Sequence, residues 1–412
     1  MPILFVCAAF LAIVLFWNIR RISSLWRHDS PTSTSAYADV LKAVRAVLEP
    51  PNASLQALLS SRADANQRLR RSFQLTNPFV NDDLNIHRTF VTQARGFIQA
   101  ESTPRARVAL AELSLHVVED YLSSHKDGQP IQFDDLSQVV TFKIILYSLF
   151  GADLDSMQDD DVLFCAKAIN DLWQLSKQST PAPQHLLAEL NTHLRRWLPA
   201  FPNPVDFVIP TWETMWRVVA VTVALVHCHG GPPMQHTFLR FIETPNREQF
   251  HHWASDESPS VESVVQEAIR LYPPTKKISR ITNSSLQSPW GLSFITSFFS
   301  TSLAQTSLTS IADVAGLHRD VAIWGPNSST FDPSRFHPSR VTDVQKQCLL
   351  GFGSGRLKCV AKDWAPHTAA VIAAAMLKVC SEGFIIVEGK EIGGRVGWDG
   401  WQVVPVGLST ST

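Results

Sequence analysis

The sequence contains few cysteines, and they form no cluster. Six occur among the 412 residues: Cys7, Cys165, Cys228, Cys348, Cys359 and Cys380. None belongs to a C-x-x-C pair or shows zinc-finger spacing. A disulfide framework is therefore disfavoured, and the pattern fits reduced thiols in a protein that faces the cytosol. Net charge is also lacking, at −1 overall, which argues against a nucleic-acid-binding protein because such a protein needs a basic surface.

The N-terminus lacks the features of a cleaved signal peptide. Its apolar run over residues 2–17 has no positive charge before it and no small-x-small site after it. Arg20, Arg21 and Arg27 follow the run instead. Their side chains can snorkel, which lets the segment reach the roughly 20 residues that a bilayer span needs.

These features predict three regions along the chain. Residues 1–22 form a signal-anchor transmembrane helix, residues 23–36 a linker, and residues 37–412 the catalytic domain. Positive residues after the apolar run keep that domain on the cytoplasmic side. A cleaved signal peptide or an interfacial helix is the alternative.

Beyond the linker the pattern is mostly helical, and the apolar content of 45% is enough for one large core. Helices are predicted over residues 37–48, 54–72, 105–124, 133–151, 161–176, 184–197 and 211–229. Strands are predicted late, over 383–388 and in a hairpin over 396–406 that turns at Asp399-Gly400. The expected fold class is mainly α with a minor β part.

Cys359 has the most informative setting of the six cysteines. It ends the run Phe352-Gly-Ser-Gly355-Arg-Leu-Lys-Cys359, a glycine-rich loop just ahead of a helix-forming stretch over 364–379. Loop amides and a helix N-terminus both favour a thiolate over a thiol. A lone thiolate suits axial ligation of a haem iron. Taken alone, a structural cysteine on a tight turn is the commoner explanation.

Two charged motifs lie upstream of this loop. Glu267 and Arg270 are neighbours on one helix face at i and i+3, and Arg335 stands in the later run Asp332-Pro-Ser-Arg-Phe336. A carboxylate between two guanidinium groups can form a buried, neutralised network. Alone, such a helix pair is more often solvated at the surface.

In this order the motifs resemble the cytochrome P450 family. The resemblance rests on the E-x-x-R helix, the Leu-His-Arg-Asp…Trp-Gly stretch at 317–325, the P-x-R-F element and the F-x-x-G-x-x-x-C loop, over about 261–379. It implies a cytochrome P450-like fold with haem b as cofactor and Cys359 as the axial ligand. Glu267, Arg270 and Arg335 would be the structural triad that braces the haem-side core.

The resemblance also implies further contacts with the haem. Phe352, Gly355 and Arg356 would contact it from the cysteine loop, with Arg356 standing in for the basic residue usual two positions before the cysteine. For the propionates the candidates are Arg280, His87 and Arg88, and arginine suits them because its fork matches a carboxylate. A surface salt bridge is the alternative for each.

The helix expected at 211–229 corresponds to the family's distal helix. Its usual acid–alcohol pattern, A-G-x-[DE]-T, is not found. Glu213 and Thr214 are adjacent but fall in the first turn of the expected helix, and Thr222 has only aliphatic neighbours. The segment is similar to filamentous-fungal family members of specialised metabolism that carry E-T-x-W-R-V-V.

The resemblance implies a monooxygenase of the endoplasmic reticulum membrane that hydroxylates or epoxidises a small apolar molecule in fungal secondary metabolism, with electrons from an NADPH-dependent cytochrome P450 reductase. Two alternatives stay open. An atypical member would rearrange, dehydrate or couple its substrate without oxygen insertion. An inactive truncated homologue is the second, since the chain is short and a Ser/Thr/Phe-rich stretch at about 283–312 looks like an insert or retained non-coding sequence.

Overall fold

A computed structural model describes residues 33–125, 129–178, 183–255, 258–284 and 306–406. The chain divides into two compact units, Met1–Lys42 and Ala43–Thr412, and the fold below is that of the second. The predicted membrane anchor at residues 1–22 lies outside the described residues. Within the described ranges, no helix has the length and apolarity that crossing a bilayer requires.

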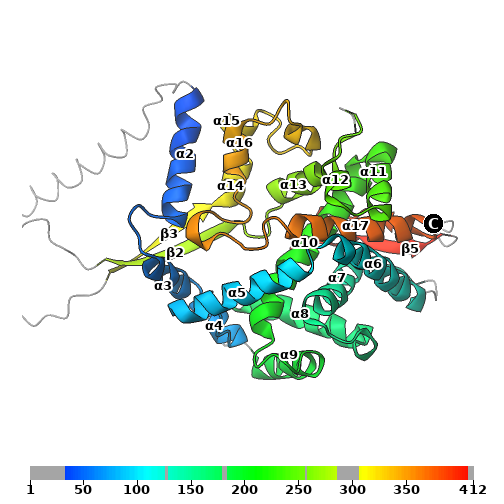
Figure 1. Ribbon diagram of the computed structural model, residues 1–412, viewed down its shortest axis with the longest axis horizontal. Coiled ribbons are helices and arrows are strands. Elements are labelled where there is room, and N and C mark those ends of the chain that lie inside the picture. The colour runs from blue at the N-terminus through cyan, green and yellow to red at the C-terminus, as the bar shows by residue number, and fades with distance from the viewer. Residues whose placement is uncertain (1–32, 126–128, 179–182, 256–257, 285–305, 407–412) are drawn as a thin grey trace, which may run out of the picture. The chain divides into compact units, whose positions relative to one another are not determined.

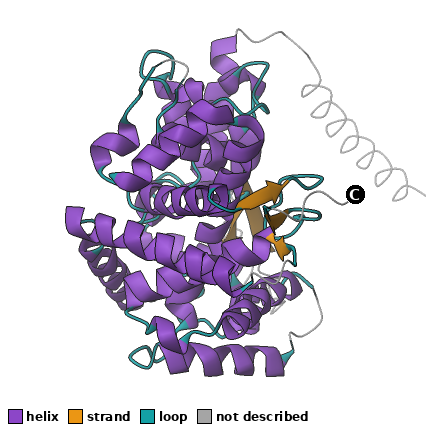
Figure 2. Cartoon of the chain, turned by 90° about the vertical axis from the view of Figure 1, so that its right-hand side faces the viewer, coloured by secondary structure: helices purple, strands orange, loops and turns teal. Residues whose placement is uncertain are grey.

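Helices dominate the described chain, as Figure 2 shows. The first half contains α2 (Ser33–Leu48), α3 (Leu55–Ala65), α4 (Gln67–Phe73), α5 (Leu84–Ala100), α6 (Pro104–Ser124), α7 (Phe133–Phe150), α8 (Asp159–Leu175) and α9 (Gln184–Trp197). The second half contains α10 (Val205–His229), α11 (Gly231–Glu243), α12 (Arg247–His251), α13 (Val261–Leu271), α14 (Val314–His318), α15 (Val321–Trp324), α16 (Asp343–Cys348) and α17 (Ala365–Ser381). The expectation of a mainly helical fold with a small β part is confirmed.

The strands form two small antiparallel sheets. In one, β5 (Gln402–Pro405) lies between β1 (Ile131–Gln132) and β4 (Phe384–Val387), with Val403 opposite both Ile131 and Ile386. In the other, β2 (Lys277–Ser284) pairs with β3 (Thr306–Asp313). Figure 1 shows the β2–β3 pair beside α3 and the β4–β5 pair beside the end of α17.

The hairpin predicted over 396–406 is wrong. Residues 399–400 do form a turn, but only the arm after it is a strand, and that strand pairs with β4 and β1. The arm before the turn contains Gly397, and Gly393 and Gly394 lie just upstream of it; glycines weaken a strand because they provide no side chain to pack. The true partner lies further upstream, at the predicted strand over 383–388.

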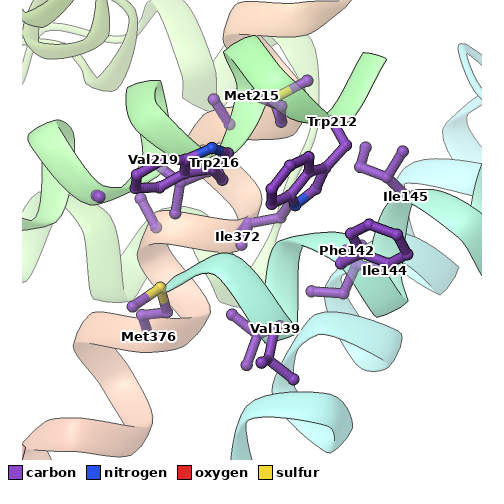
Figure 3. Packing of buried hydrophobic residues seen from close by; sticks show 14 of the residues in the cluster. Val139, Phe142, Ile144, Ile145, Trp212, Met215, Trp216, Val219, Ile372 and Met376 are labelled. Carbon is purple, nitrogen blue, oxygen red and sulfur yellow. The ribbon is translucent and has the colours of Figure 1, made fainter. Parts of the chain in front are cut away.

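The core lies where α7, α10 and α17 meet. Figure 3 shows Trp212 and Trp216 of α10 stacked over side chains of α7 and α17. Phe142 meets Trp212 edge-on, with 5.1 Å between the ring centroids. α17 presents a fully apolar, buried run from Ala369 to Ala375, in which five of the seven residues are alanine, and it packs against α6, α10 and α11. This packing fixes α17, which follows directly on the Cys359 loop.

α10 begins at Val205 rather than at residue 211, because Pro210 does not end the helix. A proline inside a helix leaves the carbonyl four residues earlier without its N–H partner. Here that carbonyl belongs to Asp206, and it accepts a hydrogen bond from Nδ2 of Asn77 at 2.8 Å. Glu213 and Thr214 therefore lie in the third turn of α10, not in its first.

Two further predictions need adjusting. The single helix expected at 54–72 is two helices, α3 and α4, which meet at Asn66. The side chain of Asn66 donates to the carbonyl of Phe79 at 3.1 Å, so it is occupied outside the helix. The stretch singled out at 283–312 ends in β3, and its residues 285–305 lie outside the described residues.

Candidate functional site

The Cys359 loop closes on itself through its own backbone. The N–H of Cys359 donates to the carbonyl of Phe352 at 2.9 Å, and the N–H of Gly353 donates to that of Leu350 at 2.8 Å. Gly353 and Gly355 both have positive φ, +70° and +67°, a region that L side chains rarely adopt. The two glycines therefore permit the path that presents the cysteine.

Cys359 is exposed as a residue, whereas Cys165, Cys348 and Cys380 are buried. Shielding by the surrounding chain raises the pKa of Cys359, and a hydrogen bond from the backbone of Ala361 opposes that rise. α17 begins six residues further on, at Ala365. The raised pKa means that the protein alone favours the thiol of Cys359, not the thiolate that the loop sequence predicts. A bound cation would favour the thiolate instead.

Glu267 lies fully buried between two arginines. Nε and Nη2 of Arg270 donate to its two carboxylate oxygens at 2.6 and 2.7 Å, a bidentate pair. Nε of Arg335 lies 3.4 Å from Oε1, and the backbone N–H of Asp332 donates to the same oxygen at 3.0 Å. The structure therefore brings together the three residues that the sequence analysis grouped.

The remaining donors of both arginines go to backbone carbonyls. Nη1 of Arg270 donates to His318 and Ser328, each at 2.6 Å, and Nη1 of Arg335 donates to Trp324 at 3.0 Å. The guanidinium of Arg270 also lies 4.8 Å from the centroid of the Trp324 ring. The network thereby connects α13 to the segment that runs from α14 to the P-x-R-F element.

His318 connects this network to the cysteine loop. Its Nδ1 lies 3.1 Å from the carbonyl of Arg270, and its Nε2 lies 3.0 Å from the backbone nitrogen of Leu350. Nδ1 must then carry the proton, and Nε2 accepts. Burial lowers the pKa of His318 to about 4, so the imidazole stays neutral. One side chain thus holds the start of the loop against α13.

A second group of cations gathers near β2. Arg280 is 8% exposed, and its Nε has no hydrogen-bond partner among the described residues. Nε and Nη2 of Arg62 on α3, and Nδ1 of His87 on α5, are likewise buried and unpaired there. Burial, then the charge of Arg280, lowers the pKa of Arg62 to about 10. Burial, then the charges of Arg62, Arg88 and Arg95, lowers the pKa of His87.

These donors fit the two carboxylates of a haem b. Buried polar groups are nearly always paired, so the unpaired nitrogens of Arg62, Arg280 and His87 indicate an anionic ligand. Arg88 is exposed and contributes its charge. The sequence analysis named Arg280, His87 and Arg88 but missed Arg62, since nothing in the local pattern of α3 links it to a strand more than two hundred residues later.

The loop residues have different surroundings. Phe352 is half-buried and packs against the core. Nε of Arg356 lies 3.2 Å from Glu49, and its Nη2 donates to the carbonyl of Ala53. A Cβ at Gly355 would collide with the carboxylate of Glu49. Arg356 therefore braces the loop against the segment after α2, and Gly355 makes room for that contact.

α10 carries a third charged group, which the sequence analysis did not identify. Glu213 is 2% exposed and forms ion pairs with Arg217, at 2.6 Å, and with Arg395. Arg395 comes from the loop between β4 and β5, so only the fold brings it to α10. Thr214 is half-buried beside this pair. An acid and an alcohol are therefore adjacent in mid-helix, with the acid held by two arginines.

Comparisons with known proteins match the C-terminal part of the chain. Residues 308–382 match the family model described as Cytochrome P450. Cytochrome P450 4A14 of Rattus norvegicus is 32% identical over 122 residues, which are 30% of this chain and 22% of that protein. Probable cytochrome P450 313a4 of Drosophila melanogaster is 26% identical over 175 residues, 42% and 33% of the two chains.

Taurochenodeoxycholic 6 alpha-hydroxylase of Sus scrofa is 30% identical over 122 residues, 30% of this chain and 22% of that protein. The chain thus covers between about a fifth and a third of the length of these relatives. The matched segment 308–382 contains His318, Arg335 and Cys359. These findings support a relationship of this chain to the cytochrome P450 family.

Proposed function

We propose that this chain is a haem-thiolate monooxygenase that hydroxylates or epoxidises a small apolar organic molecule. The observation that carries the proposal is the exposed residue Cys359, on a loop that His318 ties to the buried Glu267–Arg270 pair. A lone, braced thiol is what axial ligation of a haem iron requires. When bound, haem iron with a thiolate ligand supplies oxygen activation.

Residues of the chain would hold the cofactor from two sides. Cys359 would be the thiolate ligand, and Phe352 of the same loop packs against the core. Arg62, Arg280 and His87 take the propionates, with Arg88 adding positive charge. The unpaired nitrogens of these groups support this assignment, since carboxylates would satisfy them.

Glu267, Arg270 and Arg335 form the structural triad, and their function is to position rather than to react. Their buried network fixes the start of the cysteine loop through His318. By the family resemblance, α10 is the distal helix. Thr214 and Glu213 are the alcohol and acid nearest to the family's usual pair, and they would orient a proton donor at the site.

Partners and location follow from the same proposal. Electrons come from an NADPH-dependent cytochrome P450 reductase. The apolar run at 2–17, followed by basic residues, anchors the chain in the endoplasmic reticulum membrane with its catalytic part in the cytoplasm. The E-T-x-W-R-V-V element of α10 supports fungal secondary metabolism as the setting. One relative's name describes a hydroxylase, which supports oxygen insertion as the reaction.

A second candidate is an atypical enzyme that rearranges, dehydrates or couples its substrate without oxygen insertion. The contacts of Glu213 favour it: the carboxylate pairs with Arg217 and Arg395, so it is less free to pass on a proton than a singly bonded acid.

The two candidates differ in their use of oxygen. The test is to express the full chain with a reductase, supply ¹⁸O₂, and compare the extracted metabolites with those of Cys359→Ala. A monooxygenase yields a Cys359-dependent product that carries the label and consumes NADPH. A Cys359-dependent product without label, formed anaerobically without NADPH, would establish the second candidate instead.

A further inference from the structure

The ion pairs of Glu213 belong to a larger group of charges that is not neutral. We call it the Glu213 cluster: Glu213, Arg217, Arg395, Arg68 and Lys177. Arg68 lies on α4 and Lys177 just after α8, so three segments converge on α10 here. Nη1 of Arg217 also donates to the carbonyl of Pro274 at 2.9 Å.

Positive charge exceeds negative charge in this cluster. Burial lowers the pKa of Arg395 to about 10; the charge of Glu213 opposes that shift, and Arg217 and Arg68 add to it. The pKa of Lys177 is lowered by burial and by Arg395, Arg68 and Arg217. Four cations therefore act on one another around a single paired carboxylate.

The arginines are held in place but not fully satisfied. Arg395 and Arg68 lie over the same ring, that of Trp173, at 4.4 and 5.1 Å from its centroid. Nη1 of Arg68 donates to Oγ of Ser176 at 2.5 Å. Nη1 of Arg395 is buried and has no partner among the described residues. A preorganised donor therefore lacks an acceptor in a region of surplus positive charge.

A ligand could reach the cluster from solvent. The side chains of Arg217 and Arg395 each keep 11% of their surface exposed, and Lys177 at the edge is exposed. The Trp173 ring is half-buried, and the guanidinium groups of Arg395 and Arg68 lie over it, so the part of the ring that stays exposed adjoins the charge. Charge and aromatic surface together favour a molecule with an anionic group on an apolar body.

From this arrangement we propose that the Glu213 cluster binds the carboxylate of the substrate, and that the substrate is an apolar organic acid. Arg395 and Arg68 would bind the carboxylate, with Trp173 against the apolar body. The assignment rests on the proposed function, because it names the substrate class of that site. It adds that the substrate is charged, whereas the sequence analysis expected only an apolar molecule.

The test uses the purified full chain and two probes of equal shape, naphthylacetate and its uncharged amide, naphthylacetamide. Isothermal titration calorimetry measures the affinity for each. The proposal predicts that naphthylacetate binds at least about tenfold more tightly, since a charge-assisted hydrogen bond is lost in the amide. Equal affinity for the two probes, or binding of neither, would overturn the proposal.

Variants identify the residues. Arg395→Gln and Arg68→Gln should each reduce the preference for the acid by about tenfold. Arg68→Gln leaves both ion pairs of Glu213 intact, so it remains informative where Arg395→Gln fails to fold. Arg196→Gln is the matched control, because Arg196 also pairs with a carboxylate, Asp161, and lies over a tryptophan ring. A preference that persists in folded Arg68→Gln, or that Arg196→Gln removes, would contradict the assignment.

Calorimetry does not depend on haem, so the two proposals fail separately. A preference for the acid in a preparation that binds no haem would leave the cluster as a carboxylate-binding site and refute the monooxygenase. Normal haem binding without the preference would refute the cluster assignment alone.

Discussion

Glu267 and Arg62 represent the two ways in which this chain buries charge. The carboxylate of Glu267 is fully enclosed and meets guanidinium and amide donors, so its charge is neutralised inside the protein. The guanidinium of Arg62 has two buried nitrogens without a partner among the described residues. The first arrangement supports the fold, and the second is the one that we propose the haem propionates satisfy.

Removing the carboxylate of Glu267 should unfold or strongly destabilise the protein. Glu267→Ala leaves Arg270 buried without its bidentate partner, a loss of about 3–5 kcal/mol in the free energy of unfolding. Urea denaturation of the purified chain measures it. Glu262→Ala is the control, since Glu262 is on the same helix and pairs with His251 near the surface. Equal, small losses in both variants would show that the Glu267 network contributes little.

Arg62→Gln should change the titration of His87. The charge of Arg62 contributes to the lowered pKa of His87, so its removal should raise that pKa toward the ordinary value. NMR titration of the His87 ring follows the shift without requiring any cofactor. The exposed Arg71 on α4 provides the control variant, Arg71→Gln. An unchanged His87 pKa in Arg62→Gln would place the two side chains further apart than the structure has them.

At the scale of single elements, α10 depends on a residue far away in the sequence. Its proline frees the carbonyl of Asp206, and Asn77 satisfies that carbonyl. The carboxylate of Asp206 in turn accepts the backbone N–H groups of Thr76 and Asn77 at 2.8 and 3.1 Å. The segment between α4 and α5 thus acts as a clamp on the first turns of α10.

This clamp predicts a measurable coupling between Asn77 and Pro210. Asn77→Ala leaves the carbonyl of Asp206 buried and unpaired, which should cost about 1–3 kcal/mol of unfolding free energy. In a Pro210→Ala background, the new N–H of residue 210 can reach that carbonyl, so Asn77→Ala should cost less. A double-mutant cycle by chemical denaturation measures the difference. Strictly additive effects would mean that Asn77 stabilises the chain by other contacts.

Two buried histidines make the packing of α14 and α17 sensitive to acid. Burial lowers the pKa of both His318 and His367 to about 4 from the usual 6.5. Between these values the unfolded chain takes up protons that the folded chain does not. Each histidine therefore contributes stability that is complete above 6.5 and is lost as the pH falls toward 4, about 3 kcal/mol each.

The prediction is a steep fall of the urea midpoint with decreasing pH in that window. His367→Gln, which cannot titrate there, should lose about half of the histidine contribution to this slope. An identical pH dependence in the variant and the natural sequence would show that His367 is not held neutral in the fold.

At the scale of the whole molecule, the sequence predicts well what depends on local pattern. Residues 184–197 read as one amphipathic helix, and α9 has those bounds. The order of the E-x-x-R, P-x-R-F and cysteine-loop motifs predicts that Glu267, Arg270 and Arg335 form one network, and the structure has these contacts. Each of these features follows from residues close together in the chain or from a family pattern.

What the sequence does not predict depends on contacts between distant segments. In the sequence, Pro210 indicates the end of a helix. The hydrogen bond from Asn77 that lets the helix continue comes from a distant segment, so the local sequence does not predict it. Arg62 and Arg395 belong to no recognisable motif. Arg62 joins its site only because α3 packs against β2, and Arg395 only because its loop folds against α10. The strand partner of β5 was missed for the same reason.

The central claim is that Cys359 is the thiolate ligand of a bound haem, and the reduced carbon monoxide complex tests it most directly. The full chain should show the red-shifted Soret band of a thiolate-ligated haem. Cys359→Ala should abolish that band, while Cys348→Ala and Cys380→Ala, which change buried thiols, should keep it. A normal band in Cys359→Ala, or its loss in either control with haem still bound, would contradict the account.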